Sequence, residues 1–144
     1  MESYIFIYNS LRKGCPNNHI MDELNALYFA SGFTIDNLLL VGSKNNDNPY
    51  LMDVNFGKNV YGDIYKININ KLKILDEIEG YPLLCNRVEK IIFYNNCLCP
   101  KKKYIPIKCY IYIINDKDMI QNIIKNVNNT LDIIDSGDWK TYNS

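Results

Sequence analysis

One stretch of this sequence changes its hydrophobic period, and that change limits the fold class. In residues 70–80, NKLKILDEIEG, apolar residues recur about every three positions from Leu72 to Ile78, which predicts an amphipathic helix. Asn70 is suited to be the N-cap of this helix and Gly80 to end it. The other segments are mostly short and rich in aromatic and β-branched residues. We therefore expect an α+β protein in which a sheet dominates.

The β-prone segments predict about six strands in a mostly antiparallel sheet that curls towards a barrel flanked by a few short helices. The expected strands are residues 4–8, two strands within 28–41 joined by a turn, 50–54, 60–67, 88–94 and 108–114. Residues 55–59, which contain Gly57, are expected as a hairpin connection. Residues 95–106 are expected as a long loop, and 19–25 and 116–126 as further helices.

Length and charge exclude several classes of protein. A chain of 144 residues suits one domain, 1–144, with a real core. Sixteen basic and sixteen acidic residues cancel, so nothing favours nucleic acid or an anionic membrane as partner. No signal peptide or membrane-spanning segment is expected. Five widely spaced cysteines indicate reduced thiols in the cytoplasm. The oligomeric state is left open.

The sequence lacks the residues that several kinds of catalysis require. There is no phosphate-binding glycine motif, and His19 is the sole histidine, which restricts any nucleophile–histidine pair. Cys97-x-Cys99 does not have the spacing of a zinc site, and buried or edge-strand thiols are the simpler interpretation. We expect no metal and no cofactor, and we expect His19 to be a surface or helix-cap residue.

Carboxylates are the remaining candidates. Asp76, Glu77 and Glu79 lie near the end of the predicted helix, where the helix dipole disfavours negative charge. Asp76 and Glu79 are neighbours on the helix surface, and Glu77 points elsewhere. This position suits a carboxyl group whose pKa is raised for acid–base work, although a solvated helix face is the simpler alternative.

The segment YNSLRKGCPNNH, residues 8–19, follows the first predicted strand. Four β-prone residues give way there to Asn, Ser, Gly and Pro, with two cations and a thiol among them. Such a junction is either an ordinary turn or the floor of a binding site, and the residues alone do not decide between them.

Four blocks in series resemble the gamma-glutamylcyclotransferase-like family, and within it the gamma-glutamylamine cyclotransferase branch. The family has a Tyr-Gly-Ser/Thr-Leu loop after the first strand, a Val-x-Gly-Glu-x-Tyr strand, a helix ending Leu-Asp-x-x-Glu-Gly and a Gly-Asp-Trp-Arg tail. The matching blocks here are Tyr8 to Gly14, Val60 to Tyr65, Leu75 to Gly80 and Gly137 to Lys140. The resemblance covers nearly the whole chain in the right order.

The resemblance implies a small mixed β-barrel and a cofactor-independent enzyme. Such an enzyme converts a small-molecule gamma-glutamyl amide or amine to 5-oxoproline and a free amine. Glu79 inherits the role of catalytic acid and base. The loop residues Tyr8, Asn9, Ser10 and Leu11 inherit substrate binding through backbone N–H groups.

Two departures from the family pattern affect these implications. Asn9 stands where the family has Gly, and we expect the loop to persist because Asn tolerates a left-handed backbone. Cys85 stands where many relatives have an aromatic residue. The alternative function is therefore a binding module of the same fold that does not turn over. The leaving amine and the role of Trp139 are not predicted.

Overall fold

The computed structural model describes residues 1–43, 48–95 and 103–142. Its elements, in chain order, are β1 (Glu2–Ile7), α1 (His19–Glu23), β2 (Leu27–Thr34), β3 (Leu39–Gly42), β4 (Tyr50–Met52), β5 (Tyr61–Asn68), α2 (Ile69–Glu79), β6 (Asn86–Asn95), β7 (Tyr104–Ile113), α3 (Lys117–Lys125), β8 (Asp132–Ile133) and α4 (Trp139–Tyr142). Each predicted strand and helix has a counterpart among them. The short β8 and α4 were not predicted.

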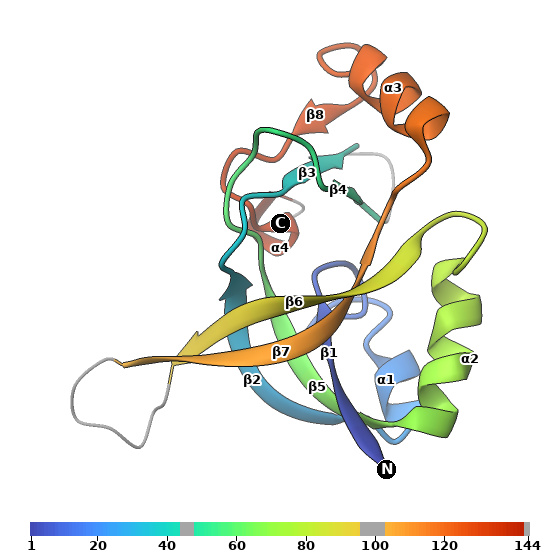
Figure 1. The fold of residues 1–144 in the computed structure, drawn as a ribbon, viewed down its shortest axis with the longest axis vertical. Helices are drawn as coiled ribbons and strands as arrows, with labels where there is room; N and C mark the ends of the chain where they lie inside the picture. Colours follow the sequence, from blue (N-terminus) through green and yellow to red (C-terminus); the bar gives the residue numbers. More distant parts are fainter. Residues whose placement is uncertain (44–47, 96–102, 143–144) are drawn as a thin grey trace.

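Five strands close into a barrel in the order β1-β5-β2-β6-β7 (Figure 1). Neighbours are antiparallel except β1 and β7, which pair in parallel with Ile5 opposite Tyr110. Phe6 and Ile64 face each other across β1 and β5, are fully buried, and share a core cluster with Ile92. The predicted α+β class, with a mixed and mostly antiparallel barrel, is confirmed.

The remaining strands form a second, three-stranded antiparallel sheet in the order β4-β3-β8, close to α4 (Figure 1). The two strands expected within 28–41 exist, but β2 belongs to the barrel and β3 to this sheet. The hairpin predicted through residues 55–59 is wrong, because that segment links β4 to β5 in different sheets. Strand β5 does not pair with β4 because β1 and β2 already occupy its two edges in the barrel. Its enclosed position is visible in four consecutive buried residues, Gly62–Tyr65.

Helix α2 has the predicted position and stop but a different cap. The N-cap lies two residues earlier than expected: Asn68, and not Asn70, caps the helix by accepting a 2.9 Å hydrogen bond from the N–H of Asn70. Gly80 ends it with φ of +85°, a left-handed conformation that glycine adopts without strain. Because α2 follows β5 without a loop, the barrel fixes where the helix begins.

Strands β6 and β7 form a long hairpin, and β7 begins earlier than predicted. Pro106, expected in the loop 95–106, lies in β7 opposite Phe93. A proline offers no N–H to a ladder, and it is accommodated near the start of β7, before the pairing of Tyr110 with β1 begins. Residues 96–102, which include Cys97 and Cys99, lie outside the described residues.

The C-terminal segment returns to the barrel. Asp132 and Ile133 pair with β3, and Trp139 at the start of α4 is 2% exposed within the same core cluster as Phe6. In the described part of the chain, no helix is both long enough and apolar enough to cross a membrane.

Candidate active site

A cavity of about 210 Å³ opens where β1, α2 and β7 end near β4. Its walls come from segments far apart in the sequence, and they include Tyr8, Asn9, Tyr50, Ile78, Glu79, Leu84, Cys85, Tyr112 and Met119. Glu79 is the one acidic or basic residue among the described lining residues. The cavity therefore combines a single carboxylate with tyrosine, amide and apolar surfaces.

Glu79, the last residue of α2, is partly buried and faces Asn9. The side-chain amide Nδ2 of Asn9 donates to Glu79 Oε1 at 3.1 Å and to Oε2 at 3.4 Å. Burial raises the pKa of the Glu79 carboxyl above its ordinary value, and the hydrogen bond from Asn9 opposes that rise. The raised pKa is in the direction that the sequence predicted for a carboxyl at this helix end.

The four predicted loop residues separate into two pairs. Tyr8 and Asn9 line the cavity, but Ser10 and Leu11 are not among its described lining residues. The hydroxyl of Ser10 donates to Asn48 Oδ1 at 2.8 Å. The N–H of Leu11 donates to the Asn9 side-chain oxygen at 3.1 Å and is therefore taken up within the loop. Substrate binding by these four residues stays a prediction.

Asn9 does not use the left-handed conformation that asparagine tolerates. The non-glycine residues with positive φ in the described chain are Asn25 and Asn128, so the backbone of Asn9 is outside the left-handed region. Its side chain holds the loop instead, since Asn9 Oδ1 accepts the N–H two residues on, and the Asn9 carbonyl accepts the N–H of Arg12 at 3.1 Å. The loop is therefore held by the amide side chain of Asn9 and does not need a left-handed backbone at that residue.

Behind the cavity, a chain of hydrogen bonds joins β1, β7 and α2. Tyr8 Oη donates to the carbonyl of Tyr112 at 2.7 Å, and Tyr112 Oη donates to Asp76 Oδ1 at 2.6 Å. The other oxygen of Asp76 pairs with Arg87, whose guanidinium stacks over the ring of Tyr110. Asp76, the predicted neighbour of Glu79, is thus a structural anchor, and Glu77 is exposed. Tyr112 was not predicted, because one tyrosine among twelve carries no motif.

Cys85 lies against the same helix end. It is buried, and its thiol lies 3.5 Å from the backbone carbonyl of Glu79, to which it donates. Burial, with the nearby charges of Glu79 and Asp76, raises the pKa of the thiol to about 11. The thiol is therefore protonated at neutral pH and unsuited to nucleophilic attack.

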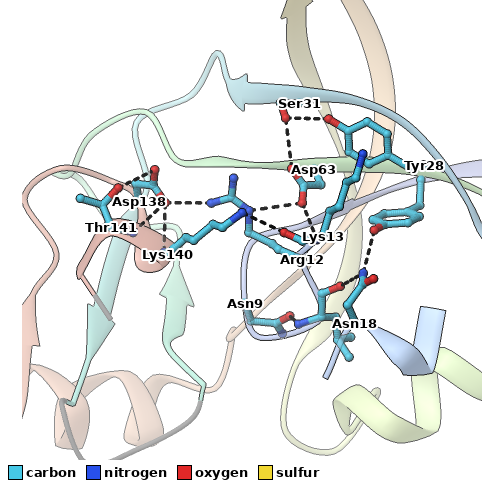
Figure 2. Close-up of polar contacts among 12 residues, drawn as sticks. Asn9, Arg12, Lys13, Asn18, Tyr28, Ser31, Asp63, Asp138, Lys140 and Thr141 are labelled. Atoms are coloured by element: carbon cyan, nitrogen blue, oxygen red, sulfur yellow. Dashed lines mark hydrogen bonds and ion pairs between the residues drawn. The ribbon is translucent and has the colours of Figure 1, made fainter. Parts of the chain in front are cut away.

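Arg12 fixes the loop to the rest of the fold. It is 7% exposed and lies between Asp63 on β5 and Asp138 just before α4 (Figure 2). Its Nη1 donates to Asp138 at 2.8 Å, and its Nε lies 3.5 Å from Asp63. Asp63 also accepts the N–H of Lys13 at 2.9 Å. The sequence placed these residues in separate motifs and did not predict that they meet.

Other candidate sites take no part in this cavity. His19 is exposed at the start of α1 and does not line it. Within residues 1–43, 48–95 and 103–142, no three His, Cys, Asp or Glu side chains gather as metal ligands would. Cys97-x-Cys99 lies outside the described residues.

Comparison with known proteins gives a consistent family. A family model described as "Gamma-glutamyl cyclotransferase, AIG2-like" matches residues 5–141. The rat gamma-glutamylaminecyclotransferase is 32% identical over 89 residues, which are 59% of this chain and 60% of the rat protein. The human gamma-glutamylaminecyclotransferase is 29% identical over 87 residues, or 58% and 57% of the two chains. The matches therefore span about 60% of the length of these curated relatives.

A solved structure has the same fold. The crystal structure of a mouse AIG2-like protein matches with a TM-score of 0.69 at 23% identity, and the match covers 83% of this chain and 82% of that one. At that identity the likeness concerns the fold alone. Together with the family model, it confirms the resemblance that the four sequence blocks predicted.

Proposed function

The chain belongs to the gamma-glutamyl cyclotransferase, AIG2-like family, and on that premise we propose that it is a cyclotransferase acting on a gamma-glutamyl amide or amine. The observation that carries the proposal is the position of Glu79, a carboxylate with a raised pKa that lines the cavity in contact with the loop after β1. The proposed products are 5-oxoproline and a free amine. The proposal includes a cytoplasmic location, where thiols such as the free Cys15, Cys85 and Cys109 stay reduced.

In this reaction the substrate attacks itself. The α-nitrogen of the gamma-glutamyl group forms a bond to the γ-carbonyl carbon, and the bond from that carbon to the leaving nitrogen breaks. At neutral pH the α-nitrogen is an ammonium and cannot attack, so a base must first remove a proton. The α-ammonium loses two protons in all and the leaving nitrogen gains two. Glu79 accepts a proton before attack, returns one to the leaving amine, and ends as a carboxylate.

The raised pKa of Glu79 suits both halves of this role. A general base and acid works best with a pKa near the operating pH, and an ordinary glutamate, near 4.3, is too weak a base. Because the nucleophile is part of the substrate, holding the gamma-glutamyl chain in a folded conformation supplies much of the acceleration. Tyr8 and Asn9 are the loop residues in position to do so, since both line the cavity.

The proposal is tested by incubating the protein with gamma-glutamyl amino acids and gamma-glutamyl-ε-lysine and measuring 5-oxoproline. We expect release by the wild-type chain and a loss of at least about 100-fold in Glu79→Gln, the usual contribution of a general acid–base. Glu77→Gln is the matched control, because Glu77 is exposed on the same helical turn. Equal activity of Glu79→Gln and the control would remove Glu79 from the mechanism.

One observation favours a second candidate, a binding module of the same fold without turnover. The family resemblance places glycine at position 9, whereas in this chain the side-chain amide of Asn9 donates a hydrogen bond to the Glu79 carboxylate. In that case no substrate yields 5-oxoproline, while gamma-glutamyl ligands still raise the melting temperature of the protein.

A further inference from the structure

The side chain of Asn9 is engaged at both ends. Its Nδ2 donates to both oxygens of Glu79, at 3.1 and 3.4 Å, and its Oδ1 accepts the N–H of Leu11 at 3.1 Å. Asn9 is 5% exposed, so water competes little for these contacts. One buried amide therefore links the catalytic candidate on α2 to the loop backbone 70 positions earlier in the chain.

The loop holds this amide in a fixed place. The carbonyl of Asn9 accepts the N–H of Arg12 at 3.1 Å, and the N–H of Asn17 donates to the carbonyl of Ser10 at 3.0 Å. Arg12 is itself held between Asp63 and Asp138 (Figure 2). Because the donor sits on an anchored turn, its hydrogen bond restricts Glu79 instead of following the movements of that side chain.

We propose that Asn9 is a positioning residue of this chain: its amide orients the Glu79 carboxylate that lines the cavity and favours the charged form of that group, while its oxygen withdraws the Leu11 N–H from ligands. The catalytic consequence rests on the proposed function. The effect of Asn9 on the Glu79 carboxylate does not rest on the proposed function, because it is a property of the free protein.

The groups that face Glu79 make Asn9 its principal polar partner. Burial and the negative charge of Glu79 raise the pKa values of Tyr8, Cys85 and Tyr112. These three groups are therefore neutral at pH 7. Asp76, on the same helix, has its charge paired with Arg87. A carboxylate accepts several hydrogen bonds, so the Asn9 amide leaves acceptor positions on Glu79 open to a substrate ammonium.

The test follows the Glu79 carboxyl carbon by ¹³C NMR while the free, full-length protein is titrated with acid. A hydrogen bond to the charged form lowers a carboxyl pKa, so its removal raises the midpoint. In Asn9→Ala we expect the Glu79 midpoint to move up by about one pH unit relative to wild type. In Asn9→Asp, which keeps an acceptor for the Leu11 N–H but replaces the donor with a carboxylate, we expect a larger rise. Should Asn9→Ala fail to fold, Asn9→Leu, which has a similar volume and no donor, takes its place, because the new carboxylate in Asn9→Asp also raises the midpoint by charge repulsion.

Asn18→Ala is the matched control, because Asn18 Nδ2 donates to the Leu11 carbonyl at 2.9 Å and supports the same loop without touching Glu79. An unchanged midpoint in the Asn9 variants, or an equal rise in Asn18→Ala, would overturn the proposal. If wild type releases 5-oxoproline, the acid limb of its pH–rate profile moves with the NMR midpoint in each variant. If it does not, the NMR result still decides the role of Asn9 while the proposed function fails.

Discussion

Tyr112 donates a 2.6 Å hydrogen bond to Asp76, and this bond ties the last turn of α2 to strand β7 of the barrel. Asp76 lies one turn before Glu79, so the same contact anchors the helical turn that carries the catalytic candidate. The second oxygen of Asp76 pairs with Arg87, which neutralises a charge that would otherwise repel Glu79. The helix dipole thus disfavours negative charge at the C-terminal end of α2, and the positive charge of Arg87 compensates for it.

Asp76→Asn tests this anchor. Asparagine can still accept from Tyr112, but Arg87 then loses its carboxylate partner in a part-buried site, where its side chain is 20% exposed. We expect a loss of about 2 kcal/mol in the free energy of unfolding, somewhat less than for a fully buried pair. Tyr112→Phe, which removes one hydrogen bond, should cost about 1 kcal/mol. Urea denaturation measures both, and Glu77→Gln should stay within about 0.5 kcal/mol of wild type.

Glu79→Gln is expected to stabilise the protein at neutral pH. Burial raises the pKa of Glu79 in the folded state above its ordinary value, so the folded state binds this proton more tightly than the unfolded state. Stability therefore falls as pH rises from the ordinary glutamate range through the folded pKa. Glutamine carries no such penalty and still accepts from Asn9. The gain should be about 1 kcal/mol above that window and absent below it.

Melting temperatures of wild type and Glu79→Gln across a pH series measure this difference. A gap that is the same at every pH would mean that packing, and not ionisation, separates the two proteins.

The sequence predicted those features that have a local cause. The helix α2 and its stop at Gly80 depend on neighbouring residues, and both are confirmed, although of the predicted apolar stripe only Leu72 and Leu75 are buried. The pairing of β5 with β1 and β2, instead of with β4, is decided by burial of the whole strand, which no local pattern expresses. A two-residue β8 carries no period at all.

The same division holds at the candidate site. The local rule that disfavours a carboxylate at a helix C-terminus singled out Asp76, Glu77 and Glu79 together, and only the family resemblance chose Glu79 among them. Its hydrogen bond to Asn9 and the support of Asp76 by Tyr112 join residues that only the closed barrel brings together. The role of the Asn9 side chain was not predicted for the same reason, since its carboxylate partner lies 70 residues away.

Gly137 is expected to tolerate a side chain less well than Gly14. Both have positive φ, +72° and +82°, where alanine is strained by roughly 1–2 kcal/mol. A Cβ at Gly137 would lie 2.0 Å from the backbone oxygen of Asn59, whereas at Gly14 it would meet only the mobile end of Lys140 at 3.3 Å. Gly137→Ala should therefore cost at least about 1 kcal/mol more in the free energy of unfolding than Gly14→Ala. Equal costs in chemical denaturation would show that the C-terminal turn moves away from Asn59 without loss.

The apolar rim of the cavity predicts the kind of amine that leaves, provided the chain is a cyclotransferase. Ile78 and Leu84 line the cavity and are 49% and 58% exposed, and none of the described lining residues carries a positive charge. An alkyl chain on the leaving nitrogen can cover these side chains, at about 0.8 kcal/mol per buried methylene. We expect kcat/KM to rise roughly threefold to fourfold per methylene along a series of gamma-glutamyl n-alkylamides until the rim is covered.

Leu84→Ser should flatten this dependence, whereas Leu83→Ser should not, because Leu83 is 90% exposed and does not line the cavity. Rates that ignore chain length in the wild-type protein would show that the leaving group points away from this rim.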